Sequence, residues 1–223
     1  MSDPQKIRYI LFDFDGVIAD TEPFNAKYLA KALAKYGISL TEEEHHSLIG
    51  TSGWTGVQKF LDSANPPVKL EDFLVERRKV GNSYEDPDVL PSPGLIDLLL
   101  KIRTLNISTA IVSSTSSAYI QTAVKRMGLQ SLFDLYICGD MVTKKKPDPE
   151  PYLMAMNRLS ARPKECLIIE DSPIGIHSAK ASGAKVIAYC GSSVMQDTSE
   201  ADYQLNAFSD FFNLCKCSGI SII

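Results

Sequence analysis

The sequence predicts an α/β fold, in which a Rossmann-like, doubly wound parallel sheet carries an inserted helical cap. Two observations predict the sheet: short apolar runs alternate with amphipathic stretches, and successive runs recur at about the spacing of strand–helix–strand units. A third observation predicts the cap. After the first apolar run, roughly a hundred residues carry helical periodicity without a strand pattern.

Five runs rich in Ile, Leu, Val or aromatic residues are expected to form the strands. They are Tyr9–Phe12, Ile107–Val112, Leu135–Cys138, Cys166–Ile169 and Lys185–Tyr189. Helices are expected between them at Leu95–Ile102, Ala118–Met127, Tyr152–Leu159 and Gly175–Ala181. Gly128 and Gly183 follow two of these helices and are expected to cap their C-terminal ends.

The long interval contains the start and stop signals of several helices. Pro23 stands in the first turn of an apolar pattern that Gly37 ends, and Thr41 with Glu44 forms a capping box for a second helix. Two more helices are expected at Trp54–Leu61 and Leu70–Val80. The expected domains are a cap at residues 21–86 and a core formed by residues 1–20 and 87–223.

Composition limits the classes of function. The chain has 223 residues, 44% of them hydrophobic, which is enough for a large core. Its net charge of −4 and pI near 5.4 disfavour nucleic-acid binding. No apolar run reaches the roughly 18 residues of a membrane span, and the polar N-terminus lacks a signal-peptide pattern. We therefore expect a cytoplasmic protein that binds neither nucleic acid nor membrane. A monomer is expected because no sustained apolar surface stripe stands out.

The five cysteines are an odd number and fit a reducing compartment. Cys138, Cys166 and Cys190 lie in apolar runs and are expected to be buried thiols. Cys215 and Cys217 form a C-x-C pair, for which a metal site is the weaker alternative because no further ligand lies nearby. The tail that begins at Cys215 is expected to be disordered or simply packed.

Two carboxylates follow the first predicted strand directly. Asp13 and Asp15 stand one residue apart after an apolar run, and like charges so close resist joint ionisation unless a cation or a shared proton relieves them. Open α/β sheets bind their ligands at the carboxyl ends of the strands. We therefore interpret the pair as functional rather than as two solvated loop acids.

Further polar residues follow the other predicted strands. Ser113 and Ser114 suit the oxygens of a phosphate, although such a pair also caps helices. Lys146 differs from the solvated lysines before it because the next residue is a proline. Glu170 and Asp171 end the fourth strand, where helix capping is the alternative role. Oxygen ligands beside a phosphate favour Mg²⁺.

These residues resemble the motifs of the haloacid dehalogenase-like hydrolase superfamily, in the branch with a helical cap between the first two motifs. The motifs are Asp13-Phe14-Asp15-Gly16-Val17, Ser113, Lys146-Pro147 and Glu170-Asp171, and the similarity spans roughly residues 6–207. The strings Asp20-Thr21-Glu22-Pro23 and Glu170-Asp171-Ser172-Pro173-Ile174-Gly175-Ile176 are similar to those of the β-phosphoglucomutase and sugar- or nucleotide-phosphatase group.

The resemblance implies a Mg²⁺-dependent phosphatase that acts on a small phosphorylated metabolite, either a sugar phosphate or a nucleotide. It makes Asp13 the nucleophile that forms an aspartyl-phosphate, and Asp15 the general acid and base. Asp13, the backbone carbonyl of Asp15 and Asp171 would hold Mg²⁺, with Glu170 as a direct or water-mediated partner. The substrate phosphoryl group would be bound by Ser113, Ser114 and Lys146.

The cap departs from the mutase pattern of this group. Gly53 stands where mutases carry an arginine, and Asn25 stands where they carry a histidine, so a phosphatase is favoured over the phosphomutase alternative. A non-catalytic binding module is a more remote alternative. Arg77 and Arg78 read as exposed helical residues rather than substrate ligands, and Trp54 fits either the cap core or stacking on a substrate ring.

Overall fold

The computed structural model describes residues 6–48 and 54–222 and divides into two compact units. The first unit, the core unit, combines Met1–Asp20 with Leu90–Ile223, and the second, the cap unit, is Thr21–Val89. The cap unit therefore ends at Val89 rather than at residue 86. It is inserted directly after the loop that carries Asp13 and Asp15.

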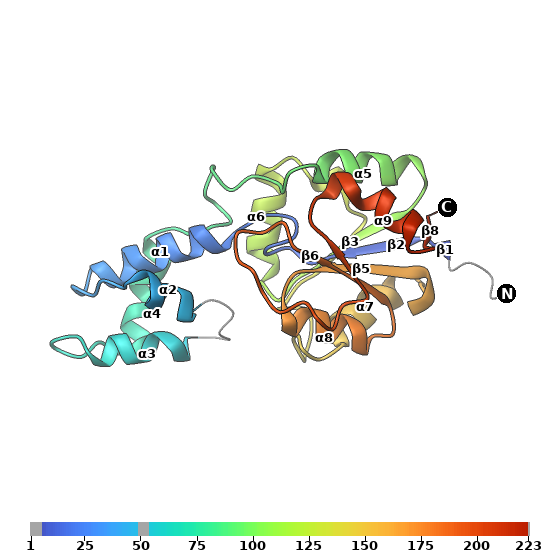
Figure 1. Ribbon diagram of the computed structural model, residues 1–223. Helices are drawn as coiled ribbons and strands as arrows, with labels where there is room; N and C mark the ends of the chain where they lie inside the picture. The colour runs from blue at the N-terminus through green and yellow to red at the C-terminus, as the bar shows by residue number, and fades with distance from the viewer. Residues whose placement is uncertain (1–5, 49–53, 223) are drawn as a thin grey trace. The chain divides into compact units, whose positions relative to one another are not determined.

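A parallel sheet forms the centre of the core unit (Figure 1). Its strands, in spatial order, are β4 Leu135–Ile137, β3 Ser108–Val112, β2 Tyr9–Phe12, β5 Cys166–Glu170, β6 Lys185–Tyr189 and β7 Tyr203–Leu205. The central neighbours β2 and β5 pair in parallel, with Phe12 opposite Ile169. Residues that follow these two strands consequently emerge side by side at one edge of the sheet.

Helices cover both faces of this sheet, which confirms the doubly wound α/β prediction. Its helices are α5 Leu95–Thr104, α6 Ser117–Arg126, α7 Glu150–Arg158, α8 Pro173–Ala181 and α9 Phe211–Cys217. In Figure 1, α5 and α9 lie on one face, and α7 and α8 lie on the other. The face below α7 and α8 buries Leu11 and Ile168 against Tyr152 and Ile176. Burial of such side chains supplies most of the driving force for this layered packing.

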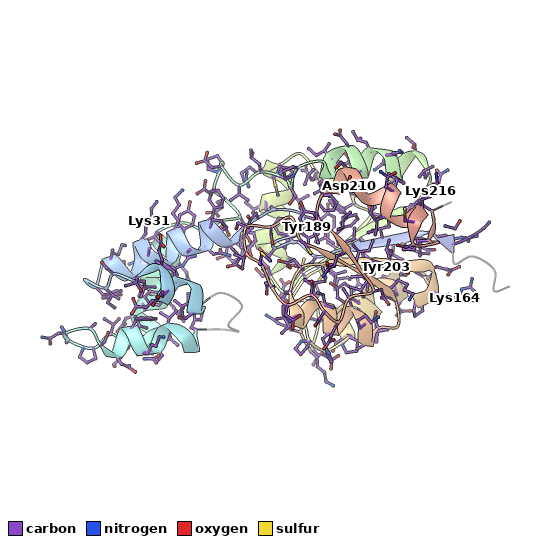
Figure 2. The ribbon with its side chains drawn as sticks, in the orientation of Figure 1. Lys31, Lys164, Tyr189, Tyr203, Asp210 and Lys216 are labelled. Atoms are coloured by element: carbon purple, nitrogen blue, oxygen red, sulfur yellow. The ribbon has the colours of Figure 1, made fainter. Side chains whose placement is uncertain are left out.

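The described C-terminal segment packs onto the core unit, which agrees with simple packing, one of the two alternatives expected for the tail, and not with disorder. After α9, strand β8 Ser221–Ile222 pairs in parallel with β1 Lys6–Ile7. Cys215 on α9 is buried, and burial raises the pKa of its thiol to about 12. Figure 2 shows Tyr189 inside the core, where its ring stacks on Phe208 with centroids 4.4 Å apart.

The cap unit is helical, as its sequence pattern indicates. Its helices are α1 Glu22–Ala34, α2 Glu42–Leu48, α3 Thr55–Asp62 and α4 Leu70–Lys79. The capping box of α2 forms in both directions: the Thr41 amide donates to Glu44 Oε2 at 2.8 Å, and the Glu44 amide donates to Thr41 Oγ1 at 3.2 Å. Leu33, Leu61 and Phe73 form a separate small core. None of the described helices is long and apolar enough to cross a membrane.

Candidate active site

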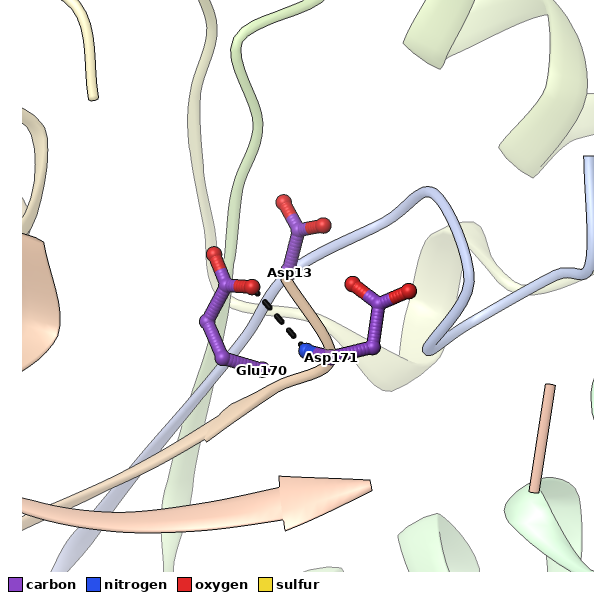
Figure 3. A group of neighbouring side chains, drawn as sticks. All are labelled: Asp13, Glu170 and Asp171. Carbon is purple, nitrogen blue, oxygen red and sulfur yellow. Dashed lines mark hydrogen bonds between the residues drawn. The ribbon is translucent and has the colours of Figure 1, made fainter. Parts of the chain in front are cut away.

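Three buried carboxylates meet where β2 and β5 end (Figure 3). The Asp13 amide donates to the Ile169 carbonyl at 2.9 Å, which continues the pairing of the two strands into the site. One carboxylate oxygen from each of Asp13, Glu170 and Asp171 lies within 4.8 Å of the others. Acids distant in sequence are thus close enough to bind one cation together.

Lys146 is the ammonium group of this cluster. Its Nζ donates to Asp13 Oδ1 and Glu170 Oε1, both at 2.6 Å, and to the Val112 carbonyl at 2.9 Å. All three donor positions of the ammonium are therefore used. The side chain is only 4% exposed, and the Lys146–Pro147 peptide bond is cis.

Glu170 is fully buried and organises its neighbours. Its Oε1 accepts the Lys146 ammonium and the Tyr152 hydroxyl, the latter at 2.9 Å. Its Oε2 accepts the amides of Asp171 and Ser172 at 3.0 and 3.2 Å, and Figure 3 shows the first of these bonds. Glu170 thus orients both Lys146 and the loop that carries Asp171. Sequence analysis assigned Tyr152 only to a helix, because periodicity reveals its buried ring and gives no signal of its hydroxyl partner.

Two glycines and a capping serine shape the loop around Asp171. Gly16 has φ 78°, and a Cβ there would lie 1.9 Å from Asp171 Oδ2. A Cβ at Gly175 would lie equally close to Glu170 Oε1. Ser172 caps α8 by accepting the Gly175 amide at 3.2 Å. Because Ser172 fulfils the capping role, Asp171 is left to face Asp13.

Acids outnumber the ammonium in this cluster. Burial, together with repulsion from Glu170, raises the pKa of Asp13 to about 8, although Lys146 opposes the shift. Burial and the same repulsion raise the pKa of Asp171 well above its usual range. Burial disfavours the Lys146 ammonium, but Asp13 and Glu170 outweigh this and raise its pKa. A divalent cation would neutralise the surplus negative charge, so this donor set fits Mg²⁺.

Hydroxyl groups follow strand β3, and one of them bonds to Asp15, the second acid of the first motif. Ser113 is buried and its Oγ accepts the Thr115 amide at 3.0 Å, which leaves its hydroxyl hydrogen to donate elsewhere. Ser114 is exposed at the same strand end. The Thr115 hydroxyl donates to Asp15 Oδ2 at 3.2 Å. Thr115 continues the hydroxyl run that begins with the two serines, and its position in the sequence gives no sign of a bond to Asp15.

The cap residues singled out from the sequence have mainly cap partners. The Ser83 hydroxyl donates to Asn25 Oδ1 at 2.8 Å. Arg77 is half-buried, and its Nη1 donates to the Gly81 carbonyl at 2.7 Å, while Arg78 is exposed. Trp54 packs edge-to-face on Phe73 with ring centroids 5.8 Å apart, which supports its cap-core role. Gly53 lies outside the described residues.

Two sequence relatives of the chain are named as phosphatases. The phosphorylated carbohydrates phosphatase of Thermotoga maritima is 29% identical, over 80% of this chain and 82% of the relative. Fructose-1-phosphate phosphatase YqaB of Escherichia coli is 26% identical, over 80% of this chain and 94% of the relative.

A solved structure extends the similarity to the whole fold. CbbY from Rhodobacter sphaeroides, in complex with phosphate, is 26% identical and superposes with a TM-score of 0.77 over 92% of this chain and 96% of that chain. The model of the haloacid dehalogenase-like hydrolase family matches residues 10–189. The matched residues include Asp13, the whole cap unit, Glu170 and Asp171, and they make up more than half of the chain. The chain therefore belongs to the haloacid dehalogenase-like hydrolase family.

Proposed function

We propose that this protein is a Mg²⁺-dependent phosphatase that hydrolyses a small phosphorylated metabolite through an aspartyl-phosphate. The observation that carries the proposal is the cluster of Asp13, Glu170 and Asp171 at the ends of adjacent strands, in which Lys146 bonds to Asp13 and Glu170. Such a site holds a cation and an anion together, as phosphoryl transfer requires.

In the first step, a carboxylate oxygen of Asp13 attacks phosphorus, and the bond from phosphorus to the substrate oxygen breaks. Lys146 holds Asp13 Oδ1, which fixes the orientation of this carboxylate. Asp15 gives its proton to the leaving oxygen, so an alcohol departs. In the second step Asp15 takes a proton from the water that attacks phosphorus, which releases phosphate and restores Asp13.

The remaining groups hold the cation and the phosphoryl oxygens. Asp13, Asp171 and the carbonyl of Asp15 would bind Mg²⁺, which when bound offsets the negative charge of the phosphoryl group. Glu170 already accepts several protein donors, so we assign it a water-mediated contact. Ser113 and Ser114 would donate to the phosphoryl oxygens, where charge accumulates in the transition state. Lys146 would join them by releasing one of its three present acceptors.

A sugar phosphate is the substrate class we favour. The relatives named above include phosphatases of phosphorylated carbohydrates and of fructose 1-phosphate.

A substrate screen tests the proposal. Purified protein is incubated with sugar phosphates, nucleotides and phosphoglycolate, with Mg²⁺ and with EDTA, and free phosphate is measured. We expect Mg²⁺-dependent release, greatest with a sugar phosphate. Failure to hydrolyse any of these or a generic aryl phosphate would instead favour a binding module without activity.

Asp15→Asn tests the acid–base role separately. This substitution removes the titrating group, and we expect turnover to fall by about 10²–10⁴-fold. Mg²⁺ binding should be retained, because the proposed cation contact of Asp15 is its backbone carbonyl. A variant with wild-type turnover would contradict the assignment.

A phosphomutase is the second candidate, since the string Glu170–Ile176 resembles that of the β-phosphoglucomutase group. Incubation with β-glucose 1-phosphate and a trace of the corresponding bisphosphate separates the two activities. A phosphatase releases free phosphate, whereas a mutase forms glucose 6-phosphate. We expect free phosphate, because Asn25 replaces the histidine of the mutases.

A further inference from the structure

The segment of residues 191–198, which joins β6 to β7, has one inward face. Its even-numbered residues are half-buried and its odd-numbered residues are exposed. This period of two is typical of an extended chain that packs on one side only. Gln196 belongs to the inward face, and together with Asp171 it lines a cavity of about 330 Å³ in the core unit.

Gln196 bonds to one oxygen of the cluster. Its Nε2 donates to Asp171 Oδ2 at 3.3 Å, and an ionised carboxylate can only accept in such a bond. The same Oδ2 lies so close to Gly16 that no side chain fits there. Asp171 Oδ2 is therefore hydrogen-bonded by Gln196 and packed beside Gly16, which limits the orientations of this carboxylate.

The segment is anchored on both sides of Gln196. The Ser193 amide donates to Asp20 Oδ2 at 2.8 Å. Gln204 Nε2 on β7 donates to Thr198 Oγ1 at 3.0 Å. These two bonds restrain the segment on either side, so Gln196 loses little conformational freedom when Asp171 binds a cation.

We propose that Gln196 is a positioning residue, which holds Asp171 so that one carboxylate oxygen is presented to Mg²⁺. The inference rests on the cation site of the proposed function and adds a residue that lies outside the four motifs. Hydrogen-bond partners of metal ligands typically change metal affinity by 10–100-fold when they are removed. An effect of that size is expected here.

Calorimetric titration of the full chain with MgCl₂, without substrate, tests this role. Gln196→Met keeps the length of the side chain and removes the donor, and we expect the Kd for Mg²⁺ to rise by roughly 10–100-fold. Gln204→Met is the matched control, because Gln204 lines the same cavity but bonds to Thr198. We expect Gln204→Met to raise the Kd much less than Gln196→Met does, because the Ser193 anchor and the bond from Gln196 to Asp171 both remain.

Two results would overturn the inference: an unchanged Kd for Gln196→Met, or an equal rise for Gln204→Met, which would assign the effect to packing of the segment. Phosphate release by the wild-type protein is measured in parallel. If the wild type hydrolyses sugar phosphates while Gln196→Met binds Mg²⁺ normally, the inference alone fails. If the wild type is inactive while Gln196→Met loses Mg²⁺ affinity, the proposed function alone fails.

Discussion

The core unit and the cap unit each contain a carboxylate bonded by a lysine and a tyrosine, and the charge around these two groups is balanced differently. In the core, Glu170 accepts Lys146 and Tyr152. In the cap, Asp86 accepts Lys27 at 2.8 Å and Tyr28 at 2.8 Å. The donor chemistry is the same in both units.

The surroundings of the two groups differ. Asp86 has a cation of its own, and the hydrogen bond from Lys27 lowers its pKa to about 2. In the core, Lys146 is shared by Asp13 and Glu170, with Asp171 beside them, and the pKa of Asp13 is raised. A carboxylate whose charge is matched by its own cation, such as Asp86, stabilises the fold. An excess of buried negative charge, as around Asp13, indicates a ligand-binding site.

The largest difference between the two groups should appear in turnover. Asp13→Asn removes the proposed nucleophile, and we expect phosphate release to fall by about 10⁴–10⁶-fold, the range found when a covalent nucleophile or its catalytic partner is lost. Asp86→Asn changes a carboxylate that is hydrogen-bonded by Lys27, Tyr28 and the amide of Asp88, all in the cap unit. Its kcat should remain within a few-fold of wild type, as measured in the same assay. Comparable losses from both variants would remove the distinction.

Removal of each lysine compares the two groups in stability. Lys146→Met leaves buried carboxylates without their ammonium, and we expect a loss of about 3–5 kcal/mol in the free energy of unfolding. Lys27 is 43% exposed, so water already screens its pair with Asp86. Lys27→Met should therefore shift the urea midpoint only slightly. A Lys146→Met midpoint equal to wild type would show that the core charge is compensated in another way.

The pH dependence of stability should have opposite signs in the two units. Asp13 has a folded pKa of about 8 against 3.8 ordinarily, so its contribution is complete below pH 3.8 and is lost as the pH rises through 8. Asp86 has a lowered folded pKa, so its contribution is present above pH 3.8 and is lost as the pH falls through about 2.

Thermal unfolding with EDTA and with Mg²⁺ over this pH range measures both contributions. In EDTA, Asp13→Asn should flatten the decline of Tm between about pH 4 and pH 8, and Asp86→Asn should flatten the decline at lower pH. Mg²⁺ should raise the wild-type Tm most at high pH, where it no longer competes with protons. A Mg²⁺ effect that is equal at all these pH values would contradict the raised pKa of Asp13.

The sequence predicted the central strands and the acidic residues at their ends, because burial selects apolar residues and cation binding selects carboxylates. Apolar runs located β2 and β5, and the acids that follow them stood out because a buried strand rarely ends in charge. Sequence reasoning missed β1 and β8 because strands of two residues are too short to show a period, and β7 because its sequence, Tyr-Gln-Leu, is not a continuous apolar run like that of β4.

Sequence reasoning also failed where a side chain acts through one distant partner. Tyr152 is fully buried, so its apolar ring explains its position in α7 without its hydroxyl. Gln196 lies in a polar segment, where an amide attracts no notice until Asp171 is placed beside it. Family resemblance identified the motif residues and gave no sign of these partners.

The smallest expected effect comes from the two tyrosines, whose hydroxyl groups are removed by Tyr152→Phe and Tyr28→Phe. The Tyr152 hydroxyl is buried against Glu170 Oε1, which keeps Lys146 as a donor, so its loss should cost about 1 kcal/mol of stability. Because Lys146 would then bond Glu170 without competition, its hold on Asp13 should weaken and the KM of the substrate should rise a few-fold. Tyr28→Phe should leave the KM unchanged, since Lys27, the ammonium that shares Asp86 with Tyr28, bonds to no carboxylate of the proposed cation site. If the two variants have equal KM values, Tyr152 only stabilises the fold, as Tyr28 does.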